Sequence, residues 1–226
     1  MLFLGLLAGM VVGDLLAHAS GIDAFRVYLA SLILMVPALL GAKLLYVLSH
    51  WHHYRDDRKR IWRSGEGGGA MYGGLLLVLP FSIPVLAALH LSAGSYWDVA
   101  VFTMLVAMVL GRLGCLMNGC CAGRHSKSFL GVYLPNREGV WQRRVPTPCL
   151  EAALGLALVV LALAFRHSMP FPGSLFLLVT TGYALGRLAL ESTREQTHAG
   201  RFTIHHGISI LLIVSCLGTL AFRWPR

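Results

Sequence analysis

The chain alternates between long apolar runs and polar connections. The apolar runs cover residues 1–19, 27–49, 70–91, 99–117, 148–166, 173–190 and 204–222. Each run is close to the ~20 residues that an α-helix needs to cross ~30 Å of hydrocarbon. Because backbone groups in lipid must be hydrogen-bonded internally, the pattern predicts an all-α fold, a polytopic membrane bundle of about seven transmembrane helices. We expect a single integral membrane domain over residues 1–226.

Composition supports a membrane protein. The chain is 56% hydrophobic and 13% charged, whereas a soluble domain carries about 25% charged residues. The net charge of +9 therefore points to lipid headgroups or to membrane topology, and no nucleic-acid partner is expected. The first run ends in Ala17-His18-Ala19, similar to a signal-peptidase site. No Lys or Arg precedes it and it contains Asp14, so we expect a retained first span.

The basic residues of the connections allow two interpretations. Most of them lie in three long connections, residues 50–69, 118–147 and 191–203. The positive-inside rule would put these connections in the cytoplasm. Alternatively, the arginines belong to a site for an anionic substrate, which would bias the count. The sequence leaves both open.

The polar stretch 111–124 follows the fourth run and carries Arg112. A charge at membrane depth is costly and usually faces the bundle interior or a wet cavity. Cys115, Cys120 and Cys121 follow within nine residues. They are either small buried apolar residues or reactive thiols beside the arginines. They lack the paired spacing of a zinc site, so we expect no metal and no cofactor.

A second polar group closes the sixth run. Tyr183, Arg187 and Glu191 are spaced four apart and Arg194 lies three further on, so they share one helical face. One interpretation is a buried Arg–Glu pair that fixes helix register. The other is that Glu191 holds Arg187 toward a phosphate while Tyr183 donates a hydrogen bond, because a guanidinium matches phosphate oxygens bidentately.

A glycine-rich stretch, residues 65–74, precedes the third run and contains Tyr72, Gly73 and Gly74. It is either a linker or a segment whose backbone approaches a headgroup at a helix N-terminus. It is no phosphate-binding P-loop, because the Gly-Lys-Ser/Thr ending is absent. The candidates for a general base are His125, His205 and His206.

These segments together resemble the prolipoprotein diacylglyceryl transferase family. Stretch 111–124 is similar to the signature Gly-Arg-x-Gly-Asn-Phe-x-Asn-x-Glu-x-x-Gly-Arg, with matches at Gly111, Arg112, Gly114, Asn118, Gly123 and Arg124. Residues 183–194 fit the family's Tyr-x-x-x-Arg-x-x-x-Glu-x-x-Arg, and residues 146–151, which end in Glu151, resemble its His-Pro-Ser-Gln-Leu-Tyr-Glu. Residues 41–48 and 69–74 resemble two further family segments.

The resemblance implies a transferase of lipoprotein biosynthesis in the bacterial cytoplasmic (inner) membrane, with its active site on the periplasmic side. Its donor would be phosphatidylglycerol or a related anionic phospholipid, and its acceptor a prolipoprotein cysteine or another acceptor. The implied catalytic residues are Arg112, Asn118, Tyr183, Arg187 and Glu191. The implied substrate-binding residues are Tyr72, Gly73, Gly74, Gly123, Arg124, Glu151 and Arg194.

The chain departs from the family pattern at four positions. Cys115 stands where the family has Asn, Cys120 where it has Glu, and Tyr72 and Val145 where it has His. We therefore expect the lipid donor to be kept and the acceptor side to be altered. The alternatives are a relative that binds lipid without transfer or uses a non-lipoprotein acceptor, and a thiol-redox membrane protein.

Overall fold

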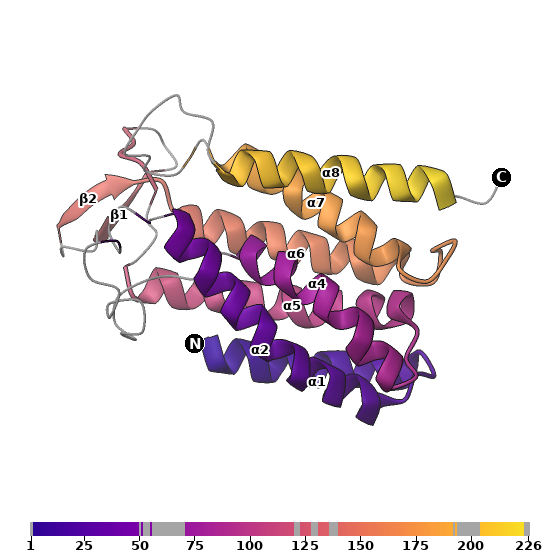
Figure 1. Cartoon of the computed structure of the whole chain (residues 1–226). Helices are drawn as coiled ribbons and strands as arrows, with labels where there is room; N and C mark the ends of the chain where they lie inside the picture. Colours follow the sequence, from indigo (N-terminus) through magenta and orange to yellow (C-terminus); the bar gives the residue numbers. More distant parts are fainter. Residues whose placement is uncertain are drawn as a thin grey trace. The chain divides into compact units, whose positions relative to one another are not determined.

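The computed structural model describes residues 2–49, 51, 55, 71–119, 123–127, 131–135, 140–191, 193 and 204–223. These residues form the helices α1 (Leu2–Ala19), α2 (Ala24–Ser49), α4 (Met71–Ala88), α5 (Ala93–Met117), α6 (Thr147–Phe165), α7 (Ser174–Glu191) and α8 (Ile204–Arg223) (Figure 1). Each helix overlaps one predicted run, and the prediction of an all-α polytopic membrane bundle is confirmed.

Four of the described helices are long and apolar enough to cross a membrane, and they lie at Ala24–Ser49, Ala93–Met117, Thr147–Phe165 and His206–Arg223. Two shorter apolar helices lie at Phe3–Ala19 and Tyr72–Ala88. Large apolar side chains point outward along the helices; Phe3 is 80% exposed and Val160 66%. Such surfaces suit lipid as the surrounding solvent. Seven crossings remain a prediction.

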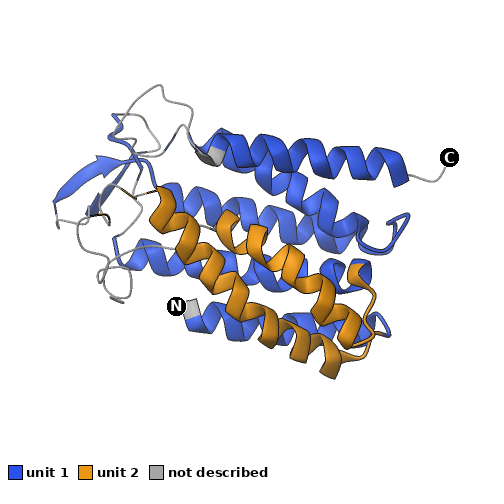
Figure 2. Cartoon of the chain, in the orientation of Figure 1, with its two compact units in different colours: residues 1–21, 94–226 blue, residues 22–93 orange. Residues whose placement is uncertain are grey.

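The chain divides into two compact units (Figure 2). One comprises residues 1–21 and 94–226, and the other comprises residues 22–93. The prediction of a single domain stays a prediction. Each unit has its own helix packing.

The smaller unit is built on the contact between α2 and α4. A Cβ atom on Gly41 would collide with the carbonyl oxygen of Gly73, and a Cβ on Gly73 with that of Gly41. A Cβ on Gly74 would lie 2.9 Å from the carbonyl oxygen of Ala38. Small residues let helix backbones approach closely in membranes. Gly73 and Gly74 therefore serve helix packing, and their contact with a headgroup stays a prediction, as does that of the buried Tyr72.

Glycines also set the helix contacts of the larger unit. A Cβ on Gly9 of α1 would lie 2.6 Å from the carbonyl oxygen of Thr103 in α5. A Cβ on Gly155 of α6 would lie 2.8 Å from a methyl group of Val109, also in α5. Helix α7 contacts both α6 and α8. Helices α5, α6 and α7 are therefore neighbours, and polar groups near their ends can meet.

Helix α5 starts six residues before the predicted run, at Ala93 instead of residue 99. The added residues include Tyr96, Trp97 and Asp98, which lie between two predicted runs. Both aromatic side chains are buried, and the indole of Trp97 packs on Phe176 with ring centroids 4.9 Å apart. Asp98 accepts hydrogen bonds from α7. The turn is thus part of the core.

The connection between α5 and α6 carries a small sheet. Strands β1 (Val132–Pro135) and β2 (Trp141–Arg144) pair antiparallel. The segment 123–126 runs beside the end of β2, where the amide of Gly123 donates to Val145 O at 2.9 Å and that of Ser126 to Arg143 O at 3.0 Å. No strand is predicted here from the sequence. The sheet holds this connection against the ends of α6 and α7.

Candidate functional site

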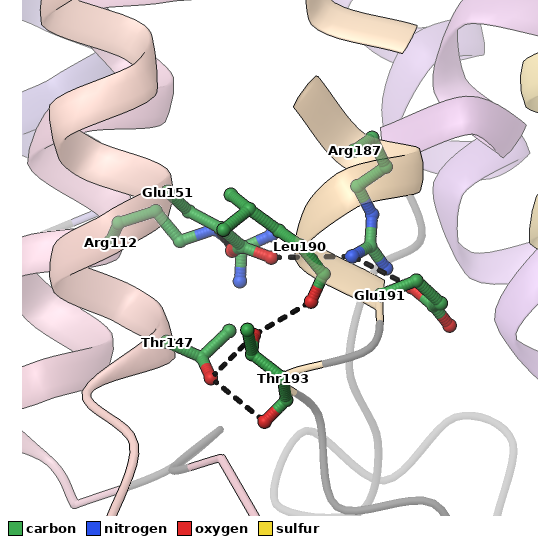
Figure 3. A network of polar contacts seen from close by, with 7 residues as sticks. All are labelled: Arg112, Thr147, Glu151, Arg187, Leu190, Glu191 and Thr193. Atoms are coloured by element: carbon green, nitrogen blue, oxygen red, sulfur yellow. Dashed lines mark hydrogen bonds and ion pairs between the residues drawn. The ribbon is translucent and has the colours of Figure 1, made fainter. Parts of the chain in front are cut away.

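Two arginines and two glutamates from α5, α6 and α7 form a chain of ion pairs (Figure 3). Arg112 Nε lies 2.5 Å from Glu151 Oε2. The other oxygen, Glu151 Oε1, lies 3.4 Å from Arg187 NH1. The same Arg187 nitrogen lies 2.8 Å from Glu191 Oε2. Positive and negative groups therefore alternate along the cluster, which we call the Arg–Glu chain.

The Arg–Glu chain is largely shielded from solvent. The exposed fractions of its side chains are 19% for Arg112, 4% for Glu151, 7% for Arg187 and 8% for Glu191. Buried charges are costly unless they are paired, and the formal charges here sum to zero. Arg112 is the member most open to a ligand.

Local sequence explains part of this geometry. Arg187 and Glu191 are one helical turn apart on α7, so their pairing follows from the four-residue spacing, and the predicted Arg–Glu pair is confirmed. Glu151 lies in the second turn of α6, after Pro148 in the first turn. Its contact with both arginines was not predicted, because the resemblance had assigned it to substrate.

Hydroxyl groups join α6 and α7 beside the Arg–Glu chain (Figure 3). Thr147 Oγ1 lies 3.2 Å from Thr193 Oγ1 and donates to Thr193 O at 3.4 Å. Thr193 Oγ1 in turn donates to Leu190 O at 2.6 Å. Thr147 is almost fully buried. The start of α6 is thereby fixed to the end of α7.

Gly123 fits this joint because it has no side chain. A Cβ there would lie 2.5 Å from Thr193 O and 2.8 Å from Val145 O, and would collide with Thr147 Oγ1. The amide of the next residue, Arg124, donates to Thr193 O at 2.9 Å. The predicted residue Gly123 thus lies beside the site, where it permits close backbone approach.

Arg144 is a buried cation that is not among the predicted site residues. It is 3% exposed, and its guanidinium donates to Gly123 O at 3.5 Å and to Gln142 Oε1 at 2.9 Å. The same oxygen of Gln142 contacts His125 Nε2. Arginine in a basic loop resembles a solvated residue in sequence. The available signal was its position shortly before the predicted run at residues 148–166.

The other predicted residues are spread more widely. Tyr183 is buried on α7, one turn before Arg187. Asn118 is exposed in the turn that ends α5, and the side chain of Arg124 is exposed. Their roles, and those of Tyr72, Gly73 and Gly74, stay predictions. Cys120, Cys121 and Arg194 lie outside the described residues.

The cysteine and histidine predictions are likewise untested. Among the described residues, Cys115, Cys149 and Cys216 form no disulfide. His125 is exposed, His206 is half-buried, and the side chain of His205 lies outside the described part of the chain. No partner for a redox reaction and no general base follows from these positions.

Comparison with known proteins identifies the family. The chain matches the family model described as prolipoprotein diacylglyceryl transferase over residues 1–222. It is 28% identical to a phosphatidylglycerol–prolipoprotein diacylglyceryl transferase of Listeria welshimeri, an alignment that covers 85% of this chain and 73% of the relative. It is 32% identical to a protein of the same name from Dehalococcoides mccartyi, covering 76% of this chain and 66% of the relative. The chain thus spans roughly two thirds to three quarters of these relatives' length.

Helices able to cross a membrane, together with bacterial relatives, assign the chain to the bacterial cytoplasmic membrane as a multi-pass protein. The match over residues 1–222 covers nearly the whole chain. The chain belongs to the prolipoprotein diacylglyceryl transferase family.

Proposed function

We propose that this protein is a membrane transferase that moves the diacylglyceryl group of phosphatidylglycerol, or of a related anionic phospholipid, to a thiol acceptor. The names of its relatives state this donor and a prolipoprotein acceptor. One observation carries the proposal: Arg112 of α5 and Arg187 of α7 meet at a single buried carboxylate. Two guanidinium groups from separate helices are thereby held close enough to act on one phosphate.

Among the contacts of the described residues, the two arginines keep donors for a ligand. A guanidinium has five N–H donors in a fixed fork. The contacts with Glu151 and Glu191 engage Nε of Arg112 and NH1 of Arg187. Other N–H groups of the two forks can hold phosphate oxygens, and such bonds are strong where water is excluded. Tyr183 and Asn118 would position the rest of the donor.

The reaction is a displacement at carbon. The sulfur of the acceptor attacks the glyceryl carbon that carries the phosphate, and a carbon–sulfur bond forms as the carbon–oxygen bond breaks. The electron pair of the broken bond stays on oxygen, so glycerol phosphate leaves. The thiol proton passes to a base or to solvent. Because negative charge grows on the leaving phosphate, arginines fixed beside it would lower the barrier.

We place the site on the periplasmic side of the membrane, as in the family. Buried Arg144 lies in the connection that also positions Gly123 beside the site. This supports the interpretation that arginines of the long connections belong to an anion site. Reporter fusions within the connection 118–147 test the side: alkaline phosphatase should be active there and a cytoplasmic fluorescent reporter dark. The reverse pattern would put the site in the cytoplasm.

Transfer itself is tested with purified protein, phosphatidylglycerol labelled in its acyl chains and a lipobox peptide with one cysteine. We expect label on the peptide and an equal amount of glycerol phosphate, and neither with a peptide in which Ser replaces that Cys. Arg112→Ala and Arg187→Ala should each lower the rate by about 100-fold or more. Glycerol phosphate release without labelled peptide would identify another acceptor. Bound lipid with neither product would identify a lipid-binding protein.

A further inference from the structure

Glu151 is the only described member of the Arg–Glu chain that contacts both arginines. Its Oε2 faces Arg112 on α5 and its Oε1 faces Arg187 on α7. Glu191, by comparison, contacts Arg187 from the same helix. The Glu151 side chain is 4% exposed, less than any other member. One carboxylate therefore joins three helices at the point where the two cations meet.

We propose that Glu151 is a positioning residue of the transferase. It acts through the arginines, holding the two guanidinium groups at one separation so that a single phosphodiester receives donors from both. It also offsets their charge, which limits how tightly the anionic lipid is held before transfer. The inference rests on the proposed function, and it replaces direct substrate contact as the role of Glu151.

The backbone around Glu151 supports a fixed position. The amides of Cys149 and Leu150 donate to Pro146 O at 3.0 and 3.2 Å in the first turn of α6. Thr147, one turn before Glu151, is bonded to Thr193 just beyond α7. The distance between Glu151 and α7 is therefore set by the hydrogen bonds of Thr147 with Thr193 as well as by ion pairs. Long arginine side chains lose much rotamer freedom when ordered, and a prepositioned carboxylate orders both before the lipid arrives.

The net charge of the Arg–Glu chain predicts how a change at Glu151 should alter lipid affinity. The Arg–Glu chain sums to zero, so a bound phosphodiester makes it −1. In a Glu151→Gln variant the chain is +1, and the same lipid brings it to zero. The variant should therefore bind anionic lipid more tightly while the arginines lose their common anchor. A residue that only supports folding would reduce the number of active molecules and leave KM for lipid unchanged.

The experiment compares Glu151→Gln with Glu191→Gln, which makes the same charge change but touches only Arg187 among the described arginines. Turnover is measured against the mole fraction of phosphatidylglycerol in phosphatidylcholine nanodiscs, with thermal unfolding as a check on the fold. For Glu151→Gln we expect kcat to fall about 100-fold and KM to fall about threefold or more. For Glu191→Gln we expect a similar fall in KM and a loss in kcat of about tenfold or less.

Two results would overturn the inference. A rise in KM for Glu151→Gln would mean that Glu151 contacts the lipid, and equal losses of kcat in both variants would mean that joining the arginines is unimportant. If Glu151→Gln fails to fold, Glu151→Asp takes its place. Asp keeps the charge and shortens the side chain, so kcat should fall with KM near the wild-type value, and full turnover would overturn the inference.

Failure of the proposed function has a different appearance. In that case the wild-type protein transfers nothing to any acceptor, and the role of Glu151 is tested by lipid binding alone. Phosphatidylglycerol retained after detergent purification is then counted by native mass spectrometry. More retained lipid in Glu151→Gln than in wild type supports the charge-limiting role, and equal or less retained lipid refutes it.

Discussion

Each end of α7 holds a carboxylate, half-buried Asp98 at one end and buried Glu191 at the other, and the two carboxylates have different donors. At the N-terminal end, Asp98 of α5 accepts the amide of Gly173 at 2.6 Å and that of Phe176 at 2.9 Å. At the C-terminal end, Glu191 faces the guanidinium of Arg187 at 2.8 Å. Backbone amides are fixed by the chain and each donates once, whereas a guanidinium has several donors. Only the second end can take up an anion and keep its carboxylate paired.

The two ends of α7 also differ in the polarity of the residues around them. Around Asp98 the neighbours are apolar: Trp97 packs on Phe176 and also against Tyr96, with ring centroids 4.9 and 5.5 Å apart. At the C-terminal end, Thr193 bonds both Thr147 and the carbonyl oxygen of Leu190, the residue before Glu191. The N-terminal end is thus a closed joint that aligns α5 with α7. The C-terminal end is a polar site built on the same two helices.

The largest effect should come from Arg187→Ala. The change leaves Glu151 and Glu191 buried without the cation that they share, and breaking a buried pair costs about 3–5 kcal/mol. Thermal unfolding in detergent should show a clear loss of stability. The control is Arg143→Ala, since Arg143 is exposed and its side chain bonds only Gly131 O among its described contacts. Equal unfolding temperatures in the two variants would show that the Arg–Glu chain does not stabilise the fold.

Asp98→Asn tests whether the N-terminal end is structural. The amide side chain keeps one acceptor and turns an N–H group toward a backbone donor, which should cost about 1–3 kcal/mol. Turnover per folded molecule should stay at the wild-type value, and this separates the two ends. Asp23→Asn is the surface control, because Asp23 is half exposed and pairs with Arg26 at 3.0 Å; it should change stability by less than about 1 kcal/mol. Lost turnover in folded Asp98→Asn would show that the N-terminal end of α7 also contributes to the reaction.

Gly123→Ala and Gly111→Ala form a matched pair within the family signature. The new methyl group at 123 meets Thr193 O, Val145 O and Thr147 Oγ1, so overpacking should cost about 1–3 kcal/mol and lower turnover. At 111 no atom of the described residues, apart from the neighbouring backbone of the same helix, lies within 4 Å of an added Cβ, and alanine favours the helix by about 0.5–1 kcal/mol. Calorimetric unfolding and the transfer assay measure both. Equal behaviour would mean that the joint around Thr193 has no influence on the site.

Features that depend on local sequence were predictable. The seven helices were predictable because each apolar run has the length of a membrane span. The Arg187–Glu191 pair was predictable because a four-residue spacing is a local property of a helix. The start of α5 was predicted too late, since the carboxylate of Asp98 is stabilised by hydrogen bonds from residues about 75 positions away, which the local pattern does not reveal.

The part of the site that could not be predicted depends on tertiary contacts. Glu151 joins Arg112 and Arg187 across three helices. Which helices are neighbours cannot be predicted from the spacing of residues along the chain. Gly111 and Gly123 are both signature glycines, yet only the structure distinguishes the crowded position from the open one. Arg144 is similar: its neighbour Arg143 is exposed while Arg144 is buried, because successive residues of a strand face opposite sides.

The smallest expected effect compares one buried hydroxyl at each end of α7. Thr147 Oγ1 bonds Thr193 at the charged end, and Ser174 Oγ donates to Phe171 O at 2.6 Å at the other. Thr147→Val and Ser174→Ala should each lose about 1 kcal/mol of stability, because each removes one net hydrogen bond. Only Thr147→Val should lower turnover, severalfold, since it loosens the joint that fixes Glu151 to α7. Equal turnover in both variants would show that the arginines are positioned by their ion pairs alone.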